Sequence, residues 1–161
     1  LSRISGHYLR PDEKLPNELL EKMLAAKDFQ QGAAYTKQLL YALFDMTLHT
    51  QNEKVDVSET YNQLYREIIG QEPLAGNHFP ASFGHLMGGY DAGYYGYLWS
   101  EVYAQDMFSI FPSDDLMNAE VGGKYRSIIL ESGSMKDAID LLKEFLGREP
   151  NTDAFFKKLG I

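Results

Sequence analysis

Residues 34–49 read AYTKQLLYALFDMTLH, and this stretch decides the fold class of the chain. Its apolar residues recur at the spacing of one broad stripe along a helix, at Leu39, Leu40, Leu43, Phe44 and Leu48. A stripe of that width predicts a helix whose face packs into a core. Strict alternation of apolar and polar residues, which would indicate half-buried strands, is absent from the sequence. The sequence therefore predicts an all-α protein.

The flanking sequence carries further helix signals. Ser58 is expected to be an N-cap, Gly70 and Gly147 are expected to end helices, and Gly32 is expected to interrupt the first one. The helices expected from these signals cover residues 15–31, 58–69, 119–130, 135–146 and 151–159. A short extended piece near residues 83–87 is the one place where a strand is allowed. Residues 1–161 are expected to form a single helical domain.

Charge and composition exclude several classes of function. The chain has a net charge of −8, and a field of that sign repels phosphate backbones, so general nucleic-acid binding is not expected. No apolar run approaches the ~18–20 residues that a membrane-spanning helix needs. The absence of cysteine excludes disulfides, thiolate metal sites and a cysteine nucleophile.

Residues 79–101, FPASFGHLMGGYDAGYYGYLWSE, form the segment that carries chemistry. Its glycines allow a loop whose backbone approaches a ligand, and Asp91 is a plausible N-cap for a helix that follows. On that helix Tyr94 and Tyr97 would share one face. Phenols stay protonated at neutral pH, so both can donate a hydrogen bond to an oxygen that becomes negative during a reaction, and His85 could do the same. Composition alone favours a packing or interface role for these tyrosines.

Residues 85–102, HLMGGYDAGYYGYLWSEV, closely resemble the C-terminal active-site region of the thimet oligopeptidase and neurolysin family of zinc metallopeptidases, to which bacterial oligopeptidase A also belongs. Further matches are FPASFGH at 79–85, KYR at 124–126 and FLGREP at 145–150. The resemblance spans essentially the whole chain. It implies a mostly helical, two-lobed fold around a deep channel, and hydrolysis of short peptides by a metalloendopeptidase.

The resemblance also assigns roles to individual residues. Tyr97 and Tyr94 would stabilise the tetrahedral oxyanion beside zinc, and His85 would bind the substrate backbone by a hydrogen bond. Tyr90, on the loop made by Gly88 and Gly89, would contact the substrate and move as it binds. Tyr95 points in a different direction on the helix and is expected to pack.

The metal ligands are expected outside this sequence. The family needs HExxH on a helix and a downstream glutamate, because two histidines one turn apart can share one zinc ion while the intervening glutamate activates water. The histidines here, at positions 7, 49, 78 and 85, do not have that spacing. The resemblance places the ligands upstream of Leu1. The chain is therefore expected to be the C-terminal part of a larger peptidase, inactive alone.

Two hypotheses about function follow. The first is the peptidase fragment, and the alternative is a stand-alone peptide-binding or scaffolding module without chemistry. The expected partners are short peptides, the upstream half of the same catalytic domain and a second copy of the chain through an exposed apolar face. Nucleic acid and membrane are not expected as partners. The expected compartment is the cytoplasm, with the mitochondrion as the alternative.

Overall fold

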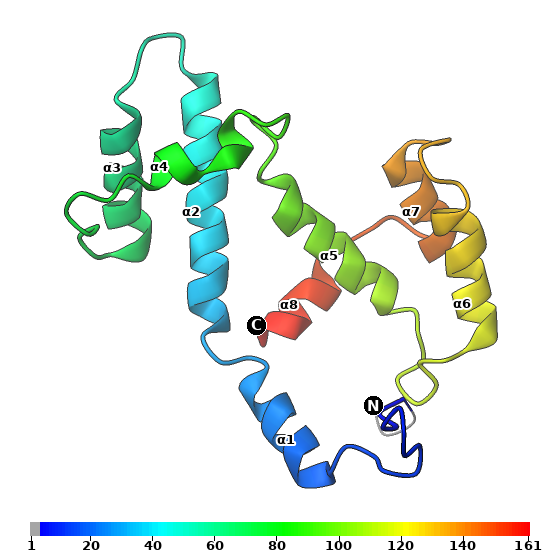
Figure 1. Cartoon of the computed structure of the whole chain (residues 1–161). Coiled ribbons are helices and arrows are strands. Elements are labelled where there is room, and N and C mark those ends of the chain that lie inside the picture. The colour runs from blue at the N-terminus through cyan, green and yellow to red at the C-terminus, as the bar shows by residue number, and fades with distance from the viewer. Residues whose placement is uncertain (1–3) are drawn as a thin grey trace.

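The computed structural model describes residues 4–161, and every regular element in that range is helical, which confirms the all-α prediction (Figure 1). The elements and their bounds are α1 (Asn17–Ala26), α2 (Gln31–Thr50), α3 (Val57–Ile69), α4 (Phe79–Ser82), the 3₁₀ turn η1 (Gly84–Leu86), α5 (Gly96–Phe108), α6 (Ala119–Tyr125), the π-helical turn η2 (Arg126–Leu130), α7 (Ala138–Leu146) and α8 (Asp153–Leu159).

The helices form two packed groups. In the first, α3 folds back along α2 and the short α4 lies against α3; in the second, α5 contacts both α7 and α8 (Figure 1). The α1 helix lies at the end of α2 and has no buried residue. The chain between α4 and α5 passes from the first group to the second, and this connection contains the glycine-rich segment singled out from the sequence.

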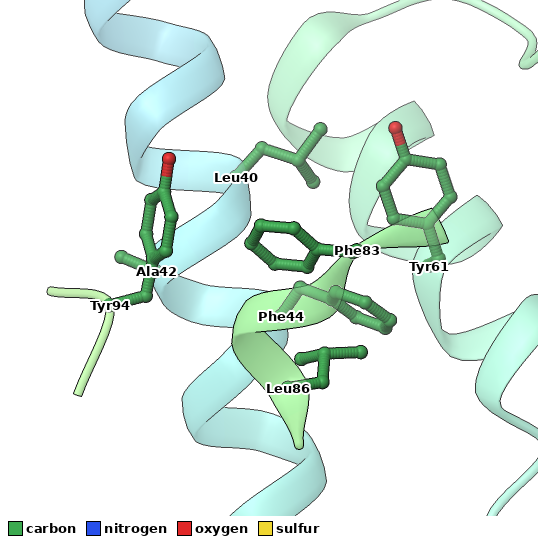
Figure 2. Close-up of a cluster of buried hydrophobic side chains, with 7 residues drawn as sticks. All are labelled: Leu40, Ala42, Phe44, Tyr61, Phe83, Leu86 and Tyr94. Carbon is green, nitrogen blue, oxygen red and sulfur yellow. The ribbon is translucent and has the colours of Figure 1, made fainter. Parts of the chain in front are cut away.

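The α2 helix supplies the centre of the first core through Leu40 and Phe44 of its apolar stripe, whereas Leu39 and Leu43 of the same stripe are exposed. Figure 2 shows its buried residues surrounded by side chains from α3, from Phe83 and η1, and from Tyr94, two residues before α5. The cluster consists of Leu40, Ala42, Phe44, Tyr61, Phe83, Leu86 and Tyr94. The ring of Phe44 meets that of Tyr61 edge-on at 5.3 Å, so α2 and α3 are joined by a specific aromatic contact.

The second core lies between α5, α6 and α7. The α7 helix buries Leu141, Leu142, Phe145 and Leu146, and the ring of Phe145 meets that of Tyr125 at 5.7 Å. On α7 the structure exposes Ile139 and buries Leu141. The α7 helix begins at Ala138, so Ile139 lies in its first turn, while Leu142, Phe145 and Leu146 are on the buried face.

Some of the helix ends expected from the sequence are confirmed, and others are wrong. Gly70 and Gly147 end α3 and α7 in the left-handed conformation that glycine tolerates, with φ of 73° and 71°. The N-cap of α3 is Asp56 and not Ser58, because the Asp56 carboxylate accepts the N–H of Glu59 at 3.0 Å. Gly32 lies in the first turn of α2 and interrupts nothing, since the preceding helix has already ended.

The one strand that the sequence analysis allowed is not formed. Residues 84–86, inside the stretch where it was placed, form the 3₁₀ turn η1, and the N–H of Leu86 donates to the carbonyl of Phe83 at 3.1 Å. Phe83 and Leu86 bury their side chains in the cluster around α2.

The packing leaves much apolar surface in contact with solvent. The accessible surface is 11701 Å², whereas a compact monomer of this mass exposes about 8,100 Å². Exposed large side chains include Trp99, Phe108 and Phe156. No helix within residues 4–161 combines the length and apolarity that crossing a bilayer requires. Both groups of helices therefore present faces that could be covered by further protein.

Candidate functional site

The residues that the sequence analysis singled out surround one cavity. This cavity, of about 620 Å³, lies between α2, the α4–η1 segment and the chain leading into α5. His85, Gly88, Tyr90, Tyr94 and Tyr97 all line it. The other lining residues are Tyr41, Phe79, Ser82, Phe83 and Gly84. Of the sequence-based candidates, only Gly89 lies outside the lining.

Tyr97 and His85 make the polar contact of this cavity. The hydroxyl of Tyr97 is 3.3 Å from Nε2 of His85, so the two groups share a hydrogen bond whose direction depends on the imidazole tautomer. Tyr97 lies in the first turn of α5 and is 43% exposed. The ring of Tyr90 stacks on that of Tyr97, with centroids 5.4 Å apart and planes 16° apart. A ligand in the cavity can therefore reach one phenol and one imidazole together.

Tyr94 lies beside Tyr97 but in a different environment. The two ring centroids are 5.0 Å apart. Tyr94 is only 8% exposed and belongs to the core cluster (Figure 2). Its hydroxyl donates to Oε1 of Gln38 on α2 at 3.0 Å. Tyr94 therefore forms the buried wall of the cavity, and its hydroxyl reaches a ligand only by exchanging its bond to Gln38.

The position of Tyr94 corrects one expectation. Asp91 does not cap a helix, because residues 91–95 form successive turns and α5 begins at Gly96. Tyr94 therefore precedes α5 instead of sharing a helical face with Tyr97. The two rings nevertheless meet, because the turn brings Tyr94 back against α2 while α5 carries Tyr97 past it.

Both phenols stay protonated well above neutral pH. Burial raises the pKa of Tyr94, although its hydrogen bond to Gln38 opposes the shift. The pKa of Tyr97 is also raised, first by partial desolvation and then by the neighbouring hydroxyl of Tyr90. A phenol with a raised pKa keeps its proton and remains a hydrogen-bond donor.

Two glycines shape the loop at the rim of the cavity. A side chain at position 88 would place its Cβ 2.9 Å from the carbonyl oxygen of Gly84, so only glycine fits there without a shift of the backbone. Gly89 has a φ of 84°, a conformation that other residues rarely adopt. The loop that presents Tyr90 therefore depends on the Gly88-Gly89 pair.

Residues outside the motif also take part, and the sequence analysis missed them. Gln38 holds the hydroxyl of Tyr94, and Asp45 accepts the backbone N–H groups of Ala92 and Tyr94. Asp45 could have been found from the sequence, because it is a charged residue inside the apolar stripe of residues 39–48. A charged group that is buried at such a position needs hydrogen-bond partners.

Tyr95 faces away from this cavity, as the sequence analysis expected. It lines a separate apolar hollow of about 380 Å³ together with Leu39, Trp99 and Phe156. Tyr95 and Tyr97 therefore lie close together in the sequence but serve different surfaces.

The described residues offer no site for zinc. Within residues 4–161, no three His, Asp or Glu side chains come close enough together to hold a metal ion. His85, the histidine in the cavity, has Tyr97 as its polar neighbour and aromatic rings around it.

The sequence matches the model of one protein family over its entire length. That model is described as peptidase family M3, and it covers residues 1–161. This chain belongs to peptidase family M3. The membership confirms the resemblance on which the sequence analysis relied, and it places the cavity of this M3 chain in a family of metallopeptidases that includes oligopeptidases.

Three relatives illustrate how the M3 chain compares with known proteins. It is 42% identical to saccharolysin of Saccharomyces cerevisiae, 40% identical to oligopeptidase A of Escherichia coli and 36% identical to a thimet-like oligopeptidase of Dictyostelium discoideum. In each case the whole of this chain is matched, to 23%, 24% and 24% of the relative respectively. The M3 chain thus spans about a quarter of the length of the curated relatives that it matches.

Proposed function

We propose that this chain forms the oxyanion-stabilising and substrate-binding wall of a zinc-dependent M3 oligopeptidase that hydrolyses short peptides. The observation that carries the proposal is the contact between the Tyr97 hydroxyl and His85 Nε2 at the lining of one cavity, with Tyr90 and Tyr94 against the same ring. We treat residues 1–161 as one helical unit of a larger catalytic region.

The proposed chemistry starts from the negative charge that develops on a peptide carbonyl oxygen when a nucleophile adds to the carbon. Tyr97 donates its hydroxyl proton in a hydrogen bond to that oxygen, and it can do so at neutral pH because a phenol is protonated there and the pKa of Tyr97 is raised further. Its present partner, His85, is free to exchange that bond for one to the peptide backbone. Tyr94 supplies the second donor once its bond to Gln38 is exchanged.

Tyr90 and the glycine loop provide the contact with the peptide chain. Tyr90 is exposed and stacks on Tyr97, so a bound peptide can meet its ring or displace it. Gly88 and Gly89 leave the backbone of this loop uncovered by side chains, which lets a peptide approach closely. The loop is the part of the wall that we expect to move on binding.

Zinc enters the proposal as the cofactor of the whole enzyme, held by residues outside this chain. The described residues do not form its site, so the steps proposed here concern only the donors that this chain supplies. It follows that the chain alone cleaves no peptide. The complete enzyme, which contains the remaining part of the catalytic domain, is the protein in which to measure hydrolysis.

The test is the Tyr97→Phe variant of the complete enzyme, assayed with a fluorogenic short peptide. We expect kcat to fall by about 10²–10³-fold with a much smaller change in KM, because the hydrogen bond is made mainly to the oxyanion. The matched control is Tyr95→Phe, which removes a hydroxyl in the same part of the chain but from the other hollow. Equal activities of Tyr97→Phe and the unmodified enzyme would refute the oxyanion role.

The alternative is a peptide-binding module that has no chemistry of its own. It is favoured by the aromatic lining of the cavity, in which Tyr41, Phe79 and Phe83 offer apolar contacts to a peptide. It predicts that short peptides bind the 161-residue chain without metal and that His85→Ala or Tyr90→Ala abolishes binding. Restored cleavage in the complete enzyme, lost again in Tyr97→Phe, would decide against it.

Two further expectations are part of the proposal. A second copy of the chain is proposed to cover the apolar hollow beside Trp99, since that surface is exposed and almost wholly apolar. The compartment is proposed to be the cytoplasm, with the mitochondrion as the alternative.

A further inference from the structure

Asp45 is a fully buried carboxylate in the middle of α2, with an exposure of 0%. One of its oxygens accepts the backbone N–H of Ala92 at 3.1 Å, and the other accepts that of Tyr94 at 3.0 Å. These partners lie 47 and 49 residues further along the chain. The side chain therefore ties the centre of α2 to the turn that precedes α5.

One other titratable group faces Asp45. Nδ1 of His49, one turn further along α2, is 3.0 Å from a carboxylate oxygen of Asp45 and 2.8 Å from the Asp45 carbonyl oxygen. A buried carboxylate is costly unless it is hydrogen-bonded, and here the two backbone N–H groups satisfy it, one on each oxygen, while the hydrogen bond of His49 goes to the Asp45 carbonyl oxygen. Both carboxylate oxygens of Asp45 therefore already accept hydrogen bonds within the chain.

The turn to which Asp45 is hydrogen-bonded contains a residue in an unfavourable backbone conformation. Ala92 has a φ of 55°, in the left-handed region that a residue with a Cβ rarely adopts because its Cβ approaches the following carbonyl oxygen. Such conformations persist when the surrounding structure determines them. The hydrogen bond from the Ala92 N–H to Asp45 is the long-range contact that fixes this residue.

The same helix fixes Tyr94 at both of its ends. Asp45 accepts the Tyr94 N–H, and Gln38 accepts the Tyr94 hydroxyl. Gln38 and Asp45 lie about two helical turns apart and so on the same face of α2. With its backbone and its hydroxyl both bound to one rigid helix, Tyr94 has a fixed ring plane, and that ring packs against Tyr97 at 5.0 Å.

We propose that Asp45 is a positioning residue for the tyrosine pair: by holding the left-handed turn at Ala92 it sets the ring of Tyr94, and through that ring the hydroxyl of Tyr97. The consequence for the reaction rests on the proposed function, whereas the consequence for the ring positions does not. Asp45 touches no substrate and acts only through these two residues.

The variant that tests this is Asp45→Asn in the 161-residue chain. Asparagine keeps the shape but has a single oxygen acceptor, and its amide group would face an N–H donor. The ring resonances of Tyr94 and Tyr97 are observed by NMR, because rings 5.0 Å apart shift each other's signals and report a change in their packing. We expect the signals of both tyrosines to move or broaden in Asp45→Asn.

The chain offers a matched control in Asp106, a second buried aspartate on another helix. Asp106 is 1% exposed and also accepts a backbone N–H, that of Asn151, but it lies outside the tyrosine cavity. Asp106→Asn should therefore destabilise the chain while leaving the signals of Tyr94 and Tyr97 in place. Unchanged tyrosine signals in Asp45→Asn, or the same changes in both variants, would overturn the proposal.

A rescue experiment keeps the test decisive if Asp45→Asn folds poorly. Glycine adopts a positive φ without the cost that alanine incurs, so Ala92→Gly makes the turn less dependent on Asp45. The double variant Asp45→Asn/Ala92→Gly should regain part of the native tyrosine signals, and failure to regain any would count against the mechanism. Ala92→Gly alone should leave them unchanged.

In the complete enzyme Asp45→Asn should lower kcat by about tenfold to a hundredfold with a smaller change in KM, since small misplacements of catalytic groups cost that much. Asp106→Asn should leave kcat unchanged where the enzyme is folded. If Tyr97→Phe retains full activity while Asp45→Asn still disturbs the tyrosine signals, the proposed function fails and the positioning role stands. Native tyrosine signals in a folded Asp45→Asn variant would reject the positioning role whatever the activity.

Discussion

Replacing Asp106 by asparagine should destabilise the chain by an amount that depends on pH. Asp106 lies on α5, and its carboxylate binds the guanidinium of Arg148 through two hydrogen bonds, one of them 3.0 Å long. It also accepts the backbone N–H of Asn151 at 2.9 Å. These bonds attach the segment between α7 and α8 to α5, so their loss loosens the second group of helices.

The size of the effect follows from the burial of each partner. A hydrogen bond to a charged group contributes about 1.5–3 kcal/mol, and removing one partner of a buried ion pair costs about 3–5 kcal/mol. Arg148 is 41% exposed on its side chain and can be rehydrated, which lowers the second figure. Asparagine also keeps one acceptor. We therefore expect a loss of about 2–4 kcal/mol in the free energy of unfolding at pH 7.

The stabilisation that Asp106 contributes should decrease at low pH. The hydrogen bonds from Arg148 hold the pKa of Asp106 below its ordinary value, and the N–H of Asn151 adds to this while burial opposes it. A carboxylate with a lowered folded-state pKa contributes stability that is present above the unfolded pKa of about 3.9. That stability is lost as the pH falls through the folded-state pKa. The difference between the chain and Asp106→Asn should be largest above about pH 4 and should shrink below it.

The assay is urea unfolding followed by circular dichroism at pH values from 7 to 2 for both proteins. The difference between their free energies of unfolding is independent of the other carboxylates, because these titrate in both proteins. A matched control is Asp114→Asn, since Asp114 is an exposed loop residue whose loss should change little. A gap between the chain and Asp106→Asn that stays constant from pH 7 to pH 2 would refute the reasoning.

Two further predictions concern the first core and the surface. Burial raises the pKa of Tyr61 to about 12, so its stabilising contribution is present below the unfolded pKa of about 10 and is lost as the pH rises toward the folded-state value. As the pH rises from 10 to 12, the free energy of unfolding measured with urea should therefore fall less in Tyr61→Phe than in the unmodified chain. An equal fall in both proteins would contradict this. The chain should self-associate in light scattering through the hollow beside Trp99, and Trp99→Glu should give monomers while Leu74→Glu, at an exposed loop position, should not. A monomeric chain at high concentration would contradict that expectation.

The helices could be predicted from the sequence where the signal was local. The stripe in residues 39–48 identified α2, and the left-handed glycines at positions 70 and 147 ended α3 and α7 as expected. The errors lie where two local signals compete. Asp56 and Ser58 are both acceptable N-caps, and only the bond from the Glu59 N–H to Asp56 decides between them.

The candidate site could be predicted only as far as its residues lie together in the sequence. His85, Tyr90, Tyr94 and Tyr97 fall within one short motif, and they do line one cavity. The difference in exposure between Tyr94 and Tyr97 could not be predicted, because it depends on where α2 passes. Asp45 and Gln38 were missed for the same reason, since long-range hydrogen bonds leave no periodic pattern in the sequence.

The two buried aspartates show how one chain can specify two packed groups of helices separately. Asp45 ties α2 to the turn before α5, while Asp106 ties α5 to the segment before α8. Each carboxylate accepts backbone N–H groups from an irregular segment, which has no helix of its own to satisfy them. The first of these ties lies beside the tyrosine cavity and the second does not. Tyr94 is therefore held by contacts within this chain, whereas the loop that carries Tyr90 is the part of the proposed wall that we expect to move.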